Sequence, residues 1–416
     1  MIRRVRHIIA FLADRLGIGF MSREFLTFVR MHGFFALGIG LSGMFIGAFM
    51  LKAGSSAATV GMFYLIAFGA EGILYFIMAW LWGKLSPTKL SRIGLVFYAS
   101  SYLFLLIFRD AAGTVFPITA ILSALGASFY WLPYHIYNVK YTKPGNRQLS
   151  MSMMGMVVNL IMLTTPVISG SVIFFLPGMY GYAAIFIISI LSFSLAAFIT
   201  RKMPSEPTGH GGNALISLFR HEMGDPLVSS LAWAHFFFGI RDGMFMFYLN
   251  LLIFTTTSNE FIMGMNNTLR SVIVIALYAV IARHNTSKIR RGGVWVAGLA
   301  AVCITLGVSL WFSAFTVIAL SLTDAAMQSF QNNTMQYASY SVSDYLSEKS
   351  GTERRNEVIA MRSSALNAGR VVGIAVSLLL PAGFGSPATV LLILSALSLP
   401  AAFFLSRIEK LRGFGE

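Results

Sequence analysis

The chain has 416 residues; 56% of them are hydrophobic, only 11% are charged, and the mean hydropathy is +0.72. Soluble domains carry about a quarter of their residues as charged side chains, so this composition excludes an ordinary soluble protein. The net charge of +15 would indicate nucleic-acid binding in a soluble protein. In a chain this apolar we interpret it as a signal of membrane topology, and we expect no nucleic-acid partner.

Residues 1–24 form the first predicted element, a basic amphipathic helix. Five arginines alternate with apolar side chains in this segment, a pattern typical of helices that lie on an anionic membrane surface. A simple surface anchor is the favoured role, and a regulatory role remains open.

Long apolar stretches follow one another through the rest of the chain. A membrane-spanning helix needs about 20 predominantly apolar residues, and twelve stretches meet that requirement. They are Met31–Leu51, Ala57–Trp82, Leu90–Phe108, Val115–Tyr137, Met151–Leu176, Tyr182–Ile199, Leu227–Phe254, Phe261–Ala282, Val294–Phe312, Phe315–Tyr340, Val358–Leu380 and Ala388–Leu405.

Basic residues gather in every second connection between these stretches, whereas the other connections contain only Lys52 and Arg109. Cytoplasmic loops carry the excess of Lys and Arg, so the pattern predicts a multi-pass protein of the inner (cytoplasmic) cell membrane with both termini in the cytoplasm. The basic residues are Lys84, Lys89 and Arg92; Lys140, Lys143 and Arg147; Arg201, Lys202 and Arg220; Arg283, Lys288, Arg290 and Arg291; and Lys349, Arg354 and Arg355.

The sequence repeats itself at about half its length. His32 matches His235 and Gly40 matches Gly243, both at an offset of 203 residues. With six helices in each half, the two repeats have the same membrane orientation, as in transporters built from parallel repeats. We therefore predict bundles at residues 25–200 and 227–406, a cytoplasmic linker at 201–226, and a cytoplasmic tail at 407–416.

In this architecture the chain resembles the major facilitator superfamily. The segment Gly83–Arg92 keeps the glycine and basic positions of that family's signature loop, but Pro87 stands where an acidic residue belongs. Thr165–Gly170 is similar to the proline–glycine turn of the family's antiporters, with small residues in place of two glycines. The resemblance implies an all-α integral membrane protein with twelve transmembrane helices in two pseudosymmetric six-helix bundles.

Charged residues inside the apolar stretches are the strongest indication of a site. A charge near the bilayer centre is costly and usually has a partner or faces a water-filled cavity. These residues are Glu71, Arg241, Asp242, Arg270, Asp324 and Arg370, and the resemblance implies that all lie on helices that line or flank a central cavity. Structural ion pairs within the C-terminal bundle are the alternative interpretation.

Three arginines against two acids leave the C-terminal half with a surplus positive charge. Guanidinium groups bind carboxylate and phosphate through a planar fork of donors. We therefore predict that Arg241, Arg270 and Arg370 bind an anionic part of the substrate. The adjacent Arg241 and Asp242 point about 100° apart on a helix, so one is expected to face the cavity while the other pairs with Arg270 or Asp324.

Glu71 is the first candidate for a proton-coupling site, with Asp242 and Asp324 behind it. No Lys or Arg lies in its own predicted helix, and a desolvated carboxyl group without a cation can gain and lose a proton near neutral pH. The alternative is a permanently protonated Glu71 that donates a hydrogen bond to a backbone carbonyl.

Aromatic and amide side chains on the fourth and tenth predicted helices complete the predicted binding site. Trp131 and Tyr134 can hold an apolar or cationic body, while Gln328, Asn332 and Asn333 can orient polar groups. The alternative is that the aromatic residues form only the inner interfacial belt.

The predicted function is secondary active transport by alternating access, in which protons drive export of an amphiphilic organic molecule with an anionic or zwitterionic group. A lipid or glycolipid flippase, a nutrient uptake symporter, and a non-transporting receptor or scaffold remain open. We expect a monomer in contact with membrane lipids, with no enzymatic activity, cofactor or metal site. The single cysteine, Cys303, excludes an internal disulfide.

Overall fold

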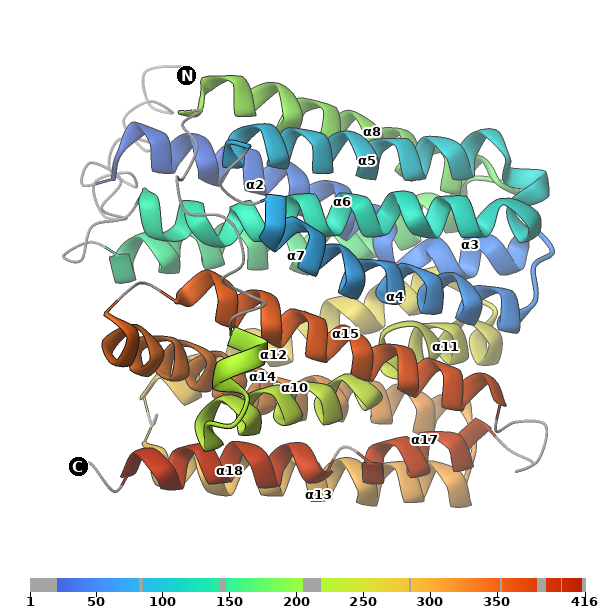
Figure 1. Ribbon diagram of the computed structural model, residues 1–416. Coiled ribbons are helices and arrows are strands. Elements are labelled where there is room, and N and C mark those ends of the chain that lie inside the picture. The colour runs from blue at the N-terminus through green and yellow to red at the C-terminus, as the bar shows by residue number, and fades with distance from the viewer. Residues whose placement is uncertain are drawn as a thin grey trace, which may run out of the picture.

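The computed structural model describes residues 21–81, 85–141, 147–204, 218–283, 286–351, 354–379, 387–397 and 399–413. Long helices account for most of these residues and run nearly parallel to one axis (Figure 1). Residues 1–20 of the predicted surface helix and residues 205–217 of the predicted linker lie outside the described residues.

The N-terminal half contains six helical segments. They are α2 (Arg23–Ser42), which continues through the short η2 (Gly43–Phe45) into α3 (Ile46–Lys52), then α4 (Ala57–Leu81), α5 (Pro87–Ile107), α6 (Ala112–Lys140), α7 (Arg147–Phe175) and α8 (Tyr180–Ile199).

The C-terminal half repeats this plan after the short η5 (Leu218–Glu222). Its segments are α10 (Pro226–Met244), which continues through η6 (Phe245–Leu249) into α11 (Asn250–Thr257), then α12 (Glu260–Arg283), α13 (Ser287–Leu310), α14 (Ala314–Ser350), α15 (Arg355–Leu379), and α17 (Pro387–Leu397) with α18 (Leu399–Gly413).

Each apolar stretch that the sequence predicts is mainly helical where the structure describes it, but hydropathy alone does not support all twelve as membrane spans. Within the described residues, nine helices are long and apolar enough to cross a membrane. Those that fall short are α10, α14 and α15. Each of them carries one or more of the predicted internal charges, which lower its hydropathy.

The repeat is visible in how corresponding helices begin and break. Ser22 caps α2 and Asp225 caps α10, each accepting a hydrogen bond from a backbone N–H in the first turn. Ser86 and Thr286 cap α5 and α13 in the same way. Both α2 and α10 give way to a different helical geometry at matching places, η2 and η6. The two halves are therefore pseudosymmetric, as the sequence predicts.

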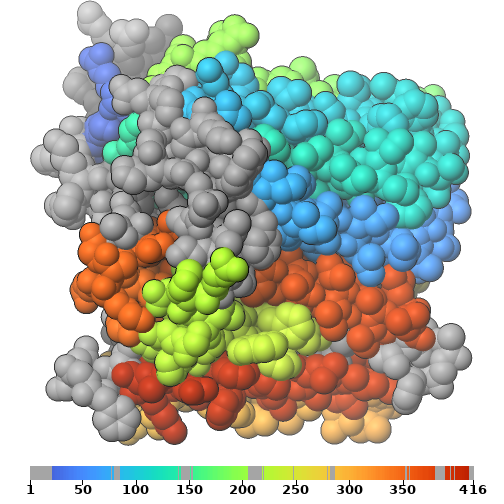
Figure 2. Space-filling view, viewed as in Figure 1, coloured from blue at the N-terminus to red at the C-terminus, as the bar shows by residue number. Residues whose placement is uncertain are grey.

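The halves meet along two pairs of helices, α4 against α15 and α7 against α12. Figure 2 shows the first pair in contact on the face turned to the viewer, α4 in blue above α15 in orange-red. In the second pair, a Cβ atom on Gly170 would lie 2.7 Å from the carbonyl oxygen of Glu260. The close approach needs glycine there, so the predicted Thr165–Gly170 turn packs the two halves together.

At the end of the bundle that contains α3 and α11 (Figure 1), an ion pair joins the halves. Lys52 Nζ at the end of α3 lies 2.7 Å from Glu260 Oε1 at the start of α12. Tyr182 of α8 donates a second hydrogen bond to the same oxygen at 3.3 Å. The start of α2 and the end of α18 lie at the opposite end of the bundle (Figure 1).

Candidate functional site

The site begins at Arg241 and Asp242, neighbours on α10 whose side chains diverge to different helices. Arg241 pairs with Asp324 of α14, whereas Asp242 pairs with Arg370 of α15. Close packing of α10 on α15 sets the second pair, because a Cβ atom on Gly243 would lie 2.6 Å from the Cα atom of Arg370. The adjacent charges thus serve two separate clusters.

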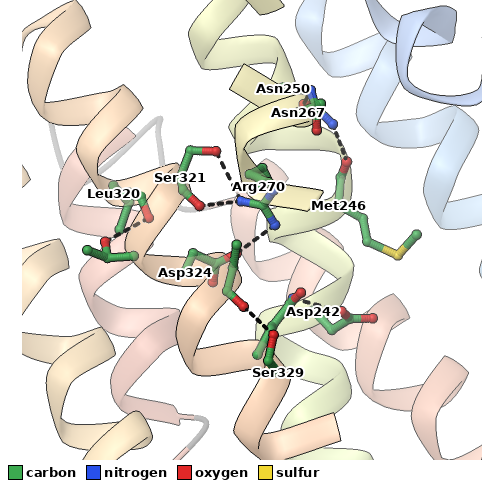
Figure 3. Close-up of polar contacts among 12 residues, drawn as sticks. Asp242, Met246, Asn250, Asn267, Arg270, Leu320, Ser321, Asp324 and Ser329 are labelled. Carbon is green, nitrogen blue, oxygen red and sulfur yellow. Dashed lines mark hydrogen bonds and ion pairs between the residues drawn. The ribbon is translucent and has the colours of Figure 1, made fainter. Parts of the chain in front are cut away.

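The first cluster is centred on Asp324, which is shared by two arginines. Arg241 pairs with its Oδ1, and Arg270 Nη2 lies 3.1 Å from its Oδ2. Arg270 Nη1 also donates to the backbone carbonyl of Ser321 at 2.5 Å and to its hydroxyl at 3.0 Å. Figure 3 shows Arg270 between Ser321 and Asp324.

Burial separates the roles of the two arginines in this cluster. The side chains of Arg241 and Asp324 are 1% and 0% exposed, whereas that of Arg270 is 20% exposed. The Arg241 guanidinium also lies over the Phe245 ring, 4.2 Å from its centroid. Arg241 is therefore held inside the bundle, and Arg270 is the arginine of this cluster that a ligand can reach.

The second cluster is centred on Arg370. Its Nε and Nη2 lie 2.8 Å and 2.7 Å from Asp242 Oδ2, and its Nη1 donates to Asn367 Oδ1 at 3.0 Å. The guanidinium lies over the Phe68 ring of α4, 4.7 Å from its centroid. Gln328 of α14 donates to the other Asp242 oxygen at 3.3 Å.

Glu71 of α4 joins this second cluster from the other half of the molecule. Its carboxyl group hydrogen-bonds with Asn367 of α15 and Tyr75 of α4, and it lies within the electrostatic influence of Arg370. The sequence-based premise that Glu71 stands apart from any cation is therefore wrong. The cation comes from α15, which no pattern within α4 could indicate.

The two clusters together contain as many acids as arginines. Arg241, Arg270 and Arg370 face Asp242, Asp324 and Glu71. The surplus positive charge of the C-terminal half is thus matched by the one acid that the N-terminal half contributes.

The predicted aromatic residues lie in a cluster around His32 of α2. Its ring centroid is 4.3 Å from that of Tyr134 and 6.0 Å from that of Trp131. His32 Nδ1 lies 2.6 Å from the hydroxyl of the buried Tyr130. Trp131 also hydrogen-bonds with Tyr98, which lies within the electrostatic influence of Glu71. The aromatic cluster therefore reaches toward the charged one.

The amides of α14 divide into those with partners and those without. Gln328 belongs to the second charged cluster, whereas the partly buried Asn332 forms no hydrogen bond with another described residue. In the same part of the chain, the buried oxygens Asn333 Oδ1 and Gln331 Oε1 also lack a partner. A buried acceptor without a donor is costly, so these amides are suited to a ligand that donates hydrogen bonds. Gln331 was not among the predicted site residues.

Two further residues of α15 escape prediction from the sequence. Asn367 looks like a simple interhelical contact, yet it touches both Arg370 and Glu71. Arg362 lies four residues into the predicted span Val358–Leu380 and so resembles a flanking charge. Its Nη1 donates to Ser339 at 3.2 Å, and it interacts electrostatically with Tyr75, His135 and His235.

An apolar groove of about 470 Å³ runs beside the second cluster between α4 and α15. Phe68 and Asn367, both in contact with Arg370, belong to its lining. Ile73 and Ile77 on its α4 side are 65% and 45% exposed. The groove therefore places apolar surface directly beside the arginine. In the described part of the chain, no group of three or more His, Cys, Asp and Glu side chains is placed to hold a metal ion.

Comparison with known proteins identifies the family. The sequence profile of the Major Facilitator Superfamily matches residues 30–345. The chain belongs to this family. It is therefore a multi-pass membrane protein and a secondary transporter of a small molecule, not an enzyme.

One relative of this superfamily member is uncharacterized, and the solved structures that share its fold come from transporters of different cargoes. An uncharacterized protein of Bacillus subtilis (strain 168), YqgE, is 24% identical over 365 residues, which cover 87% of this chain and 84% of YqgE. A bacterial homologue of the iron transporter ferroportin in an inward-facing state superposes with a TM-score of 0.67 at 13% identity, covering 92% of this chain and 98% of the homologue. The nucleoside transporter NupG gives 0.66 at 11% identity, covering 93% and 99%. At such identities the likeness shows the fold alone.

Proposed function

We propose that the chain is a proton-coupled transporter of an amphiphilic organic molecule with an anionic or zwitterionic group. The observation that carries this proposal is the chain of contacts Glu71–Asn367–Arg370–Asp242. It runs from α4 in one half to α15 and α10 in the other, so a change of charge at either end reaches both halves.

The anionic group of the cargo is assigned to Arg370 and Arg270. Their side chains are 17% and 20% exposed, against 1% for Arg241. We therefore narrow the predicted anion site to these two arginines and assign Arg241 to holding α10 against α14. The groove between α4 and α15 and the aromatic cluster around His32 would receive the apolar part of the molecule, and the amides of α14 its polar groups.

The proton is assigned to Glu71. Asp242 and Asp324 each pair with arginine, whereas the hydrogen bonds of Glu71 go to the neutral Asn367 and Tyr75. Glu71 can therefore gain a proton without the loss of an ion pair. Opening of the cavity to one side of the membrane and then to the other would give Glu71 a different proton affinity in each state.

Charge balance favours binding of the proton and the anion together. With all six groups ionised, the two clusters are neutral, and a proton on Glu71 leaves one positive charge to attract the cargo. This supports proton symport, the mode of coupling that the sequence left as an alternative to export by antiport. Export by antiport remains a second candidate because Thr165–Gly170 resembles the proline–glycine turn of the family's antiporters.

Transport into proteoliposomes tests these assignments. We expect counterflow with organic anions, and accumulation when the side of entry is acidic. Accumulation when the opposite side is acidic would establish antiport and reject co-binding. If a broad set of organic anions gives no counterflow, the anion assignment fails.

A lipid-like cargo is a second candidate function, favoured by the exposed side chains of the groove between α4 and α15. Flipping of a fluorescent anionic phospholipid in the same proteoliposomes distinguishes it. Flipping without counterflow of soluble anions would establish the lipid-like cargo.

We also propose the topology that the sequence indicates, with both chain ends and the linker in the cytoplasm. The proposed transporter consists of two bundles, at residues 25–200 and 227–406. We also propose that one chain is sufficient for transport.

A further inference from the structure

A second concave surface lies far from the charged clusters, between α13 and α18. Its volume is about 710 Å³, and it is lined by Lys288, Arg291, Gly292, Trp295, Phe403, Ser406, Arg407 and Lys410. These helices lie at the edge of the C-terminal half that faces away from the N-terminal half (Figure 1). We call this surface the basic groove.

Four cations line the basic groove, and none of the described residues in its lining is an acid. Lys288 and Arg291 come from α13, and Arg407 and Lys410 come from α18. All four side chains are exposed, and none forms an ion pair with a residue in the described ranges. Like charges so close together repel one another unless an anion lies between them.

An acid of α18 that neighbours these cations in the sequence is directed elsewhere. Glu409, between Arg407 and Lys410 in the sequence, is buried and accepts hydrogen bonds from Arg290 Nε at 2.7 Å and Nη2 at 3.0 Å. Ser287 donates to the same carboxyl group at 2.7 Å. The Arg290–Glu409 pair thus holds α13 to α18 and leaves the charge of the groove uncompensated.

Two further features match the groove to a lipid rather than to a soluble anion. Trp295 and Phe403 are 37% and 52% exposed, and aromatic residues of this kind sit at the level of lipid headgroups. The groove also lies near the start of α13 and the end of α18, where the chain enters and leaves the apolar region. Basic pockets between transmembrane helices at this depth bind anionic headgroups.

We propose that the basic groove binds the headgroup of an anionic phospholipid, with Lys288, Arg291, Arg407 and Lys410 on its phosphates and Trp295 and Phe403 beside its glycerol and upper acyl chains. The site is independent of the cargo site, because its residues belong to neither charged cluster. A headgroup with two phosphates matches four cations best, so cardiolipin should bind more tightly than phosphatidylglycerol.

Native mass spectrometry of the full-length protein in detergent, titrated with cardiolipin, phosphatidylglycerol or phosphatidylcholine, tests the proposal. We expect retained cardiolipin at concentrations where phosphatidylcholine is lost. The variant Lys288→Gln/Arg291→Gln/Arg407→Gln/Lys410→Gln should bind cardiolipin at least about tenfold more weakly, equal to about 1.4 kcal/mol. Equal retention of all three lipids by the unmodified protein would overturn the proposal without any variant.

A matched control removes four exposed cations at other helix ends: Lys89→Gln/Arg201→Gln/Lys202→Gln/Arg220→Gln. The control should retain cardiolipin like the unmodified protein. An equal loss in both variants would mean that net charge alone attracts the lipid and would refute the groove as a site. Displacement of cardiolipin by millimolar inorganic phosphate would show a phosphate site and would also refute it.

Discussion

The two halves of the molecule share the same arrangement of helices, but the side chains at their centres differ: aromatic in the N-terminal half and charged in the C-terminal half. In the N-terminal half, His32 of α2 bonds to Tyr130 among stacked aromatic rings. At the equivalent point of the C-terminal half, the one hydrogen bond of His235 of α10 to another described residue is with the Leu231 carbonyl of its own helix. The ion pairs at the centre of that half begin six residues later, at Arg241. One half is therefore held by ring packing and the other by paired charges.

This difference explains why Glu71 matters. It is the one member of the charged clusters that the aromatic half supplies, and its partners Asn367 and Arg370 belong to the ionic half. Movement of one half against the other changes the surroundings of Glu71 more than those of Asp242 or Asp324, whose partners move with them. A coupling residue needs that property, because each conformation must give it a different proton affinity.

The largest effect on this difference between the halves is expected from removal of Asp324, the carboxylate that Arg241 and Arg270 of the C-terminal half share. Asp324→Asn leaves Arg241 buried without its charged partner and deprives Arg270 of its carboxylate. Loss of one partner of a buried ion pair typically costs about 3–5 kcal/mol. We expect the variant to fold poorly in membranes and to melt at a much lower temperature in detergent. Wild-type melting would mean that the ion pairs do not hold this half.

A milder change separates charge from geometry at the cargo site. Arg370→Lys keeps the positive charge but loses the fork of donors to Asp242 and Asn367. A lost charge-assisted hydrogen bond of about 1.5–3 kcal/mol corresponds to roughly 10- to 150-fold weaker cargo binding. Counterflow at several cargo concentrations measures this, and Arg220→Lys on the surface is the matched control. Unchanged binding would leave Arg370 as a structural residue only.

Substitution of the two equivalent histidines, one in each half, compares the stabilisation that each contributes. His32→Phe leaves the buried Tyr130 hydroxyl without its hydrogen bond, whereas His235→Phe frees only a carbonyl within its own helix. We expect His32→Phe to destabilise the protein by about 1–3 kcal/mol and His235→Phe by less. Thermal unfolding in detergent compares the two. A larger loss of stability in His235→Phe than in His32→Phe would contradict the claim that aromatic packing around His32 holds the N-terminal half together.

The smallest expected effect concerns the matching helix caps Ser22 and Asp225. Partial burial raises the pKa of Asp225, but hydrogen bonds from Leu227 N–H, Tyr345 and Lys349 outweigh it and hold this pKa below its ordinary value. The stabilisation is therefore complete above the unfolded pKa of about 3.9 and is lost as the pH falls through the lower folded pKa.

Asp225→Ala should accordingly destabilise the protein by about 1 kcal/mol at neutral pH and by less below about pH 3. Ser22→Ala should show a similar loss at both pH values, since a hydroxyl does not titrate there. Unfolding curves at the two pH values measure the difference. A pH-independent loss in Asp225→Ala would refute the charged contribution.

Much of this fold was predictable because membrane helices must satisfy their backbone internally and must be long and apolar. The repeat of His32 and His235 predicted two equivalent halves, and corresponding caps and helix breaks follow it. Hydropathy failed at α10, α14 and α15, where Arg241, Asp324 and Arg370 make the helices polar. The sequence thus located the charges, and those same charges weaken the signal for a membrane span.

The partners of the charged residues were less predictable. That Arg241 and Asp242 diverge follows from helical geometry, and Asp324 was among the predicted partners. The contact of Glu71 with Asn367 depends on how α4 packs against α15, which no periodicity within either helix reveals. For the same reason Phe68 and Arg362 were not recognised as neighbours of the charged clusters.

The most direct test of the central claim is Glu71→Gln in proteoliposomes, with transport measured both under a pH gradient and at equal pH. Glutamine keeps the size and the hydrogen bonds to Asn367 and Tyr75 but cannot release a proton. Since it mimics the protonated state, exchange of cargo at equal pH should continue while accumulation driven by the gradient disappears. Normal accumulation under the gradient would contradict the assignment of Glu71 as the proton site.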